Sequence, residues 1–313
     1  MALLIRGSSL CINKGGACFV KGKNRIEIEG LPKNSLARDT WRRLLSNKAA
    51  VFGSIIMILI ILMAIFADVL YDYETQVIAM DIPNSLKAPC AEYPLGTDEF
   101  GRDILARIVH GSRMSLIISF TSVAISLVIG GICGALSGYF GGRIDNLIMR
   151  ITDILLAIPM TLFAIVIVAA LGPSTKNLAI ALAASSIPVF ARIVRSAVLT
   201  VRDVEYIEAA RAIGATNGTI ILGHVLPNCL SPIIVQVTLR IANAIYNTAA
   251  LSFLGMGVQA PDPEWGGMLS AGRTFIRDYS YLSVIPGLVI MLTVLALNLL
   301  GDGLRDALDP RLK

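Results

Sequence analysis

Two parts of this sequence combine residue types and spacing that could do chemistry. Arg240 is a single cation inside the apolar run 230–254, and a guanidinium fork suits the carboxylate of a ligand or of another subunit. Residues 205–228, EYIEAARAIGATNGTIILGHVLPN, form a polar segment with an acid, small residues, Gly and Leu-Pro. Neither part holds a nucleophile beside a base, so both predict binding rather than catalysis.

These residues are set among long apolar stretches. The sequence is 55% hydrophobic and 16% charged, with a mean hydropathy of +0.71, whereas soluble domains carry about 25% charged residues. Apolar runs near or above about 18 residues indicate membrane-spanning helices. Six runs qualify, at residues 49–67, 114–138, 154–171, 178–198, 230–254 and 281–300. They lack the alternation of barrel strands, so the sequence predicts an all-α, multi-pass membrane protein.

The distribution of basic residues predicts the orientation of these spans. With both termini in the cytoplasm, 19 of the 27 Lys and Arg residues lie in cytoplasmic segments and 7 lie outside. Cytoplasmic loops carry such an excess. The polar segment 205–228 is then cytoplasmic, and the basic pI of about 9.0 follows from topology. No basic patch interleaved with aromatic residues is present, so nucleic-acid binding is not predicted.

Catalytic and metal-binding motifs are absent from the sequence. No G-x-x-x-x-G-K-[ST] run binds a nucleotide phosphate, and no H-E-x-x-H pair binds zinc. The two histidines, His110 and His224, are expected on opposite sides of the membrane. The five cysteines show no C-x-x-C spacing, and only Cys90 is expected outside, which argues against a disulfide framework. The chain is expected to be neither an enzyme nor a cofactor-binding protein.

The polar segment has local signals for two short helices. Ala and Glu favour a short helix over YIEAARAIG (206–214), and Gly214 is placed to end it. Thr216 or Asn217 can cap a second helix, and Pro227 is expected to stop it. Ala209 and Ala210 leave room for a close approach. Taken alone, the segment favours an amphipathic interfacial helix that packs under its own bundle.

The spacing of Glu208, Ala209, Ala210, Gly214, Leu226 and Pro227 resembles the EAA loop of ABC importer permeases. In that family the loop, here 200–228, is the coupling element that inserts into the ATPase subunit. His224 departs from the usual branched aliphatic residue. Four further stretches resemble the second, C-type, permease of dipeptide and oligopeptide importers. These are PLGTDEFGRD (94–103), GYFGGRIDNLIMR (138–150), SFLGMGVQAPDPEWGGML (252–269) and GDGLRDALDPR (301–311).

The resemblance implies a type I ABC importer permease fold over residues 37–313, preceded by a flexible cytoplasmic extension over 1–36. It implies a second homologous permease, two ATP-binding subunits that hold ATP and Mg²⁺, and a periplasmic or extracellular substrate-binding protein. The implied location is the prokaryotic inner (cytoplasmic) membrane, and the implied cargo is a di- or oligopeptide. Nickel and glutathione importers share the branch. The alternative from another class is a secondary transporter driven by protons or sodium.

Three further positions keep two interpretations each. Arg240 either has a structural role, donating to helix-end carbonyls or pairing with an acid of the second permease, or it offers its charge to a peptide carboxylate in the translocation path. Asp98, Glu99 and Asp103 lack the calcium-loop pattern, and a turn ordered by glycines and Arg102–acid pairs is favoured. Trp265 is expected to be an interfacial anchor or a docking residue for a binding protein.

Overall fold

The computed structural model describes residues 10–12, 18–20 and 36–308 of the chain. Residues Met1–Asp39 and Thr40–Lys313 are two compact units. In the first unit, β1 (Leu10–Ile12) pairs antiparallel with β2 (Cys18–Val20). The expected flexible extension over 1–36 falls mostly outside the described residues and stays a prediction.

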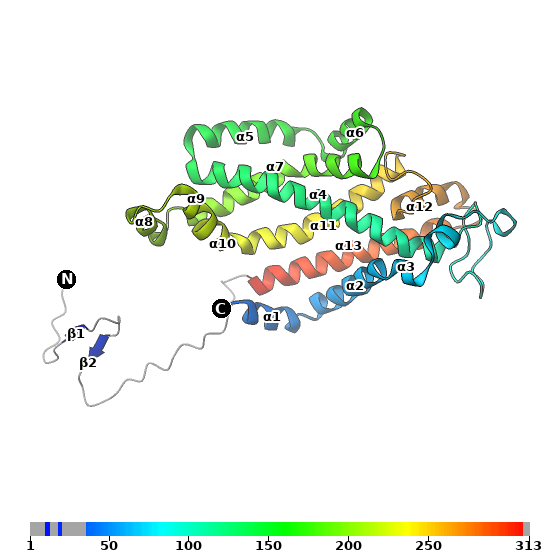
Figure 1. Cartoon of the computed structure of the whole chain (residues 1–313), viewed down its shortest axis with the longest axis horizontal. Coiled ribbons are helices and arrows are strands. Elements are labelled where there is room, and N and C mark those ends of the chain that lie inside the picture. The colour runs from blue at the N-terminus through cyan, green and yellow to red at the C-terminus, as the bar shows by residue number, and fades with distance from the viewer. Residues whose placement is uncertain (1–9, 13–17, 21–35, 309–313) are drawn as a thin grey trace. The chain divides into compact units, whose positions relative to one another are not determined.

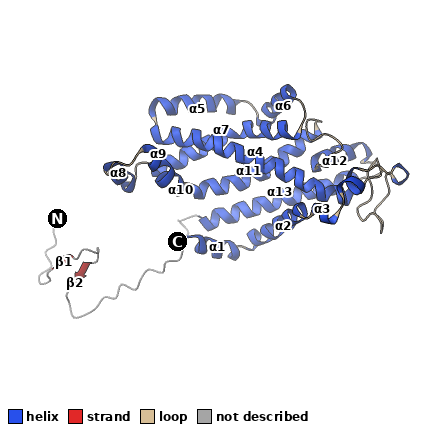
Figure 2. Ribbon diagram, in the orientation of Figure 1, coloured by secondary structure: helices blue, strands red, loops and turns tan. Residues whose placement is uncertain are grey.

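Helices build the second unit, as Figure 2 shows by colour. Its long helices are α2 (Lys48–Ile65), α4 (Ile104–Phe140), α7 (Thr175–Val201), α11 (Leu230–Phe253) and α13 (Tyr281–Leu308). They run side by side in Figure 1, where α4 lies against α7 and α13 lies between α2 and α11. The predicted all-α class is confirmed for this unit.

In the described chain, four helices are long and apolar enough to cross a membrane, or up to six if each of two bent pairs is one span. The first bent pair is α5 (Gly142–Ala157) with α6 (Met160–Leu171), at 89°. The expected span 154–171 is therefore not one straight helix. Pro159 explains the break, because the residue before a proline avoids the helical conformation and Ile158 has ψ 127°.

Short elements gather at the two ends of the bundle. Figure 1 shows α8, α9 and α10 at one end and α3 and α12 at the other. Their bounds are as follows: α1 Leu36–Ser46, α3 Ala67–Leu70, η1 Tyr73–Ile78, η2 Ile82–Asn84, α8 Glu205–Ala212, α9 Asn217–Ile220, η3 Ile221–Val225, α10 Leu226–Asn228, α12 Trp265–Gly272 and η4 Arg273–Phe275.

Side-chain caps fix where the long helices begin. The side chain of Asn47 accepts from the amides of Ala49 and Ala50 at the start of α2. Asp103 does the same for Leu105 in α4, and Ser174 for Asn177 in α7. Each cap satisfies an amide that has no partner within its helix, so short polar residues next to the apolar runs define the spans.

Three glycines bring α4 and α7 into close contact. A Cβ atom on Gly130 would lie 2.6 Å from the carbonyl oxygen of Ile187. A Cβ atom on Gly134 would overlap the carbonyl oxygen of Ala191. Gly138 meets Val198 one turn further along. Small residues let membrane helices approach until their backbones touch, and van der Waals packing then holds them together. The α4–α7 pair therefore behaves as one body.

The outer surface of the bundle is apolar. Ile58 and Leu59 of α2, Val166 of α6 and Leu288 of α13 all have large exposed side chains. Contiguous apolar surface of this kind is rare on soluble monomers and matches the hydrocarbon core of a bilayer. The interior contains apolar clusters, and Met57, Ile245 and Leu297 are buried in one of them.

Candidate functional site

The coupling segment, residues 204–228, consists of α8, α9, η3 and α10. Helix α8 ends as the sequence predicts: Gly214 has φ +86°, and the amide of Ala215 donates to the carbonyl of Ala210 at 3.1 Å. Glycine accepts this left-handed conformation without strain. Thr216 caps α9 by accepting from the amide of Thr219 at 3.3 Å. The two predicted short helices are confirmed.

The end of the segment differs from expectation. Pro227 was expected to stop the helix, but it lies inside α10, because a proline is tolerated in the first turn. The chain instead bends by 66° between residues 217–228 and α11. Leu226 is half-buried against the neighbouring apolar cluster, and Pro227 is exposed.

One face of the coupling segment is anchored in the bundle. Ile207 and Ala210 of α8 are buried, together with Ile220 of α9 and Val225 of η3. They share an apolar cluster with Val198 and other residues of α7 and α4. The expectation that Ala209 and Ala210 both face a partner was therefore wrong for Ala210. Adjacent helical residues point about 100° apart, so they do not share a face.

The other face of the segment is free in this chain. Glu208 and Ala209 are exposed, and so is Gly214. Around them lie large apolar side chains on the end of the molecule, with Ile213 at 85% and Leu222 at 70% exposure. Large exposed apolar side chains of this kind are typical of a surface that another protein covers.

Gly214→Val is expected to weaken the segment by strain alone, since a Cβ at this position would meet no atom within 4 Å. A β-branched residue at positive φ costs roughly 1–2 kcal/mol, so we expect any activity that depends on this segment to fall about fivefold to thirtyfold. Gly218→Val is the matched control, because Gly218 also faces open space and lies in α9 without a positive φ. Equal activity of the two variants would contradict a role for the Gly214 turn.

Arg240 lies at the edge of the exposed face of α11, which also carries Gln236, Asn243 and Tyr246. Asn243 and Tyr246 are exposed, and Gln236 is half-buried. The Nε atom of Arg240 is buried without a hydrogen-bond partner among the described residues. A polar face on a membrane helix turns toward protein or water. Among the described residues, the Nε of Arg240 therefore lacks the partner that a buried guanidinium nitrogen requires.

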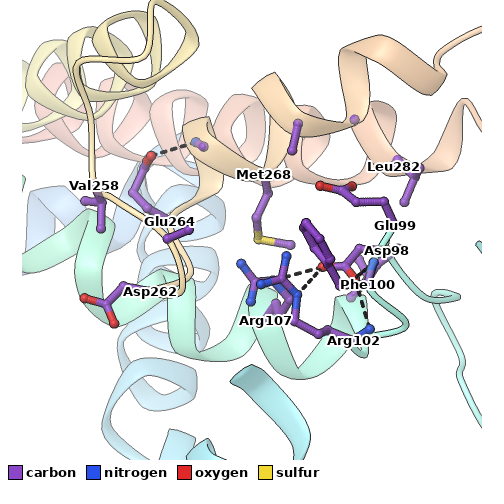
Figure 3. A pocket seen from close by; sticks show the side chains of 15 residues that line it. Asp98, Glu99, Phe100, Arg102, Arg107, Val258, Asp262, Glu264, Met268 and Leu282 are labelled. Carbon is purple, nitrogen blue, oxygen red and sulfur yellow. Dashed lines mark hydrogen bonds and ion pairs between the residues drawn. The ribbon is translucent and has the colours of Figure 1, made fainter. Parts of the chain in front are cut away.

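The end of the bundle opposite the coupling segment contains a buried charge cluster. Asp98 accepts from the Nε of Arg102 at 2.7 Å and lies 3.6 Å from that of Arg107, as Figure 3 shows. Gly96 and Gly101 have φ of +81° and +77°. The predicted turn with an Arg102–acid pair is confirmed. Asp98, Arg102 and Arg107 line a cavity of about 160 Å³.

The position of Trp265 contradicts both roles that were expected for it. Its side chain is fully buried, and its Nε1 donates to the carbonyl of Ile108 at 3.0 Å. Glu264 beside it accepts from the amides of Gly266 and Gly267 at 2.8 Å each and so caps α12. Trp265 is neither an interfacial anchor nor a docking residue. It fastens α12 to α4, because the small Gly111 lets the indole approach.

In the described residues, no group of three or more His, Cys, Asp or Glu side chains is arranged to hold a metal ion. Three features coincide: a bundle with four to six candidate spans, a half-anchored segment at one end and an uncompensated Arg240. This combination indicates a membrane protein that works with other proteins.

Comparison with known proteins gives the family. Residues 126–313 match "Binding-protein-dependent transport system inner membrane component", and residues 35–89 match "N-terminal TM domain of oligopeptide transport permease C". The chain belongs to this family of ABC importer permeases. Permeases of this family work with ATPase and substrate-binding partners. Membership sets aside the ion-coupled secondary transporter considered from the sequence.

Three curated relatives are similar over most of their length. The dipeptide permease DppC of Alkalihalophilus pseudofirmus is 50% identical, over 88% of this chain and 90% of its own. The di/tripeptide permease DppC of Pseudomonas aeruginosa is 46% identical over 88% and 92%. The glutathione permease GsiD of Pectobacterium atrosepticum is 44% identical over 88% and 91%.

A solved structure supports the fold independently. A chain of the inward-facing MetNI methionine ABC transporter superposes with a TM-score of 0.53 at 21% identity. The match covers 65% of this chain and 96% of that one. The bundle described above is therefore the ABC importer permease fold.

Proposed function

We propose that this chain is the C-type permease subunit of an importer for di- or oligopeptides. The 50% and 46% identity to permeases named for dipeptides and di/tripeptides supports this cargo. Glutathione, named for the relative at 44% identity, is the second candidate. Nickel remains a sequence-based alternative. This order of candidate cargoes is tested by adding unlabelled peptide, glutathione or Ni²⁺ as a competitor of labelled dipeptide uptake. Inhibition by Ni²⁺ or glutathione, with none by unlabelled peptide, would contradict the order.

We propose that both termini and the coupling segment are cytoplasmic. The excess of Lys and Arg in those segments, 19 against 7, supports this orientation. The apolar exterior and the number of candidate spans place the chain in a membrane, and we assign it to the prokaryotic cytoplasmic membrane. The assembly comprises a second permease, two ATPase subunits and a substrate-binding protein on the outer side.

The free face of the coupling segment carries the proposal. Glu208 and Ala209 lie on an eight-residue helix, α8, that the bundle holds from one side only. The exposed Ile213 and Leu222 extend this surface. We propose that the ATPase subunit covers it. Because this chain lacks a phosphate-binding motif, ATP and Mg²⁺ are bound by the ATPase, and this chain binds no cofactor of its own.

The mechanism is alternating access between two discrete packings of the bundle. When ATP closes the ATPase pair, α8 moves with the subunit that covers it. The anchored face passes this motion to α4 and α7, since Ile207 and Ala210 pack in the same cluster as residues of those helices. The cargo is then received from the outer side and released to the cytoplasm after hydrolysis.

Neighbouring alanines give a sharp test of the docking surface. In the complete complex, Ala209→Cys is expected to form a cross-link to the ATPase with a short thiol–amine reagent, because Ala209 is exposed. Ala210→Cys is the matched control and should not react, since Ala210 is buried at 7% exposure. Cross-linking of the Ala210 variant but not of the Ala209 variant would contradict the proposed surface.

Cys90 tests the orientation. Its side chain is exposed in the segment between α2 and α4. A membrane-impermeant maleimide applied to intact cells or spheroplasts is expected to label the chain, and Cys90→Ser should remove the label. Labelling that persists in the Cys90→Ser variant at Cys11 would place the amino-terminus outside and contradict the orientation.

A further inference from the structure

The stretch 138–150 identifies the branch of the family, and the structure gives one of its residues a role. Tyr139 is the penultimate residue of α4 and is buried at 7% exposure. Its hydroxyl donates to Oδ1 of Asn217, the first residue of α9, at 2.9 Å. The guanidinium of Arg211 in α8 lies 5.3 Å from the centroid of the same ring. One side chain of α4 thus contacts both short helices.

These two contacts lie on opposite sides of the Gly214 turn. Arg211 precedes the turn and Asn217 follows it, and Gly214 itself is exposed. Backbone hydrogen bonds from the amides of Gly214 and Ala215 close this turn, but no atom lies within 4 Å of a Cβ at Gly214, so no packing at that residue opposes bending of the turn. The Tyr139 ring therefore holds α8 and α9 at a fixed angle, through a cation–π contact to one helix and a hydrogen bond to the other.

The backbone from which the Tyr139 side chain projects is held by contacts with neighbouring helices. Its neighbour Gly138 accepts from Nη1 of Arg202, at the end of α7, through the backbone carbonyl at 2.9 Å. Ser137 contacts Asp145 of α5, which binds Arg195 of α7 with both carboxylate oxygens at 2.6 Å. The inner ends of α4, α5 and α7 are therefore joined, and Tyr139 projects from this junction toward the coupling segment.

We infer that Tyr139 is a positioning residue that transmits the motion of α8 to the α4–α7 pair. The coupling segment is covalently continuous with α7 and α11 but not with α4. When α8 is displaced, the Tyr139 contacts make the whole segment and α4 move together instead of letting the Gly214 turn bend. This inference rests on the proposed docking of the ATPase on α8.

The test measures peptide transported per ATP hydrolysed by the complete complex in proteoliposomes. Tyr139→Phe removes the hydroxyl and keeps the ring over which Arg211 lies, and we expect the ratio to fall about threefold. Tyr139→Leu removes both contacts, and we expect a fall of tenfold or more. Asn217→Asp keeps an acceptor for the hydroxyl and is expected to retain the ratio. Tyr279→Phe is the matched control, because it removes a tyrosine hydroxyl at the end of the bundle away from the coupling segment.

A purely structural role would lower the amount of complex but leave the transport-to-ATP ratio of each complex unchanged. An unchanged ratio in both Tyr139→Phe and Tyr139→Leu, with Ala209→Cys still cross-linking to the ATPase, would overturn the inference and leave the docking proposal intact. Failure of Ala209→Cys to cross-link in an otherwise native chain would overturn both. A lower ratio in Tyr139→Phe with cross-linking retained supports both.

Discussion

Ala209→Trp is expected to reduce peptide uptake about fivefold or more while the chain accumulates normally in the membrane. Ala209 is exposed on α8, so the bundle itself has room for an indole. A packed interface does not, and overfilling one costs typically about 1–3 kcal/mol, which corresponds to roughly a tenfold loss of affinity per 1.4 kcal/mol. Uptake and membrane abundance are measured in the same cells.

Two substitutions make this result specific. Ala209→Ser keeps a small side chain and should retain uptake. Ala210→Trp places the same indole one residue further, against Ile220 and Val225 in the bundle's own cluster, so it should lower the amount of chain. Wild-type uptake by Ala209→Trp, or equal loss of abundance in both tryptophan variants, would contradict an ATPase contact at Ala209.

Much of the fold follows from the sequence, because a bilayer restricts the possible structures. Backbone groups in hydrocarbon must bond within a helix, so runs such as 49–67 and 281–300 predict helices directly. The expected run 154–171 shows the limit. Composition registers an apolar stretch of span length, but Pro159 breaks the helix and α6 turns by 89° from α5.

The coupling segment was predictable because its signals are local. Gly214 and Thr216 act on amides a few residues away, and such short-range bonds depend only on neighbouring sequence. Which alanine faces the partner was not predictable in the same way. The bundle, which is formed by residues far apart in the sequence, selects Ala210 for burial.

The role of Trp265 was wrongly predicted, and that of Tyr139 was missed, for the same reason. Their partners, Ile108 and Asn217, are distant in the chain, and no spacing rule links them. The small residue Gly111 makes room for the Trp265 ring, but the sequence alone does not show that the two residues meet. Aromatic residues near span ends are commonly interfacial, and close packing of α12 on α4 overrides that tendency here.

Arg240→Gln is expected to reduce co-purification of the second permease at least about tenfold. The buried Nε of Arg240 has no partner among the described residues, and an intramembrane charge finds one in protein or water. We place that partner, an acid, on the second permease, since Arg240 lies at the edge of the exposed face of α11. Removing one member of a buried pair typically costs about 3–5 kcal/mol, enough for the expected loss.

Two controls and one contrast decide between the interpretations of Arg240. Arg240→Lys keeps the charge without the planar fork and should restore part of the co-purification, and Asn243→Ala alters the same face without removing charge. If Arg240 instead binds cargo, Arg240→Gln should leave assembly intact and impair uptake of peptides with a free carboxylate relative to amidated ones. A variant that assembles normally and transports both peptides at the wild-type rate would contradict both interpretations, because each of them gives the guanidinium a binding partner.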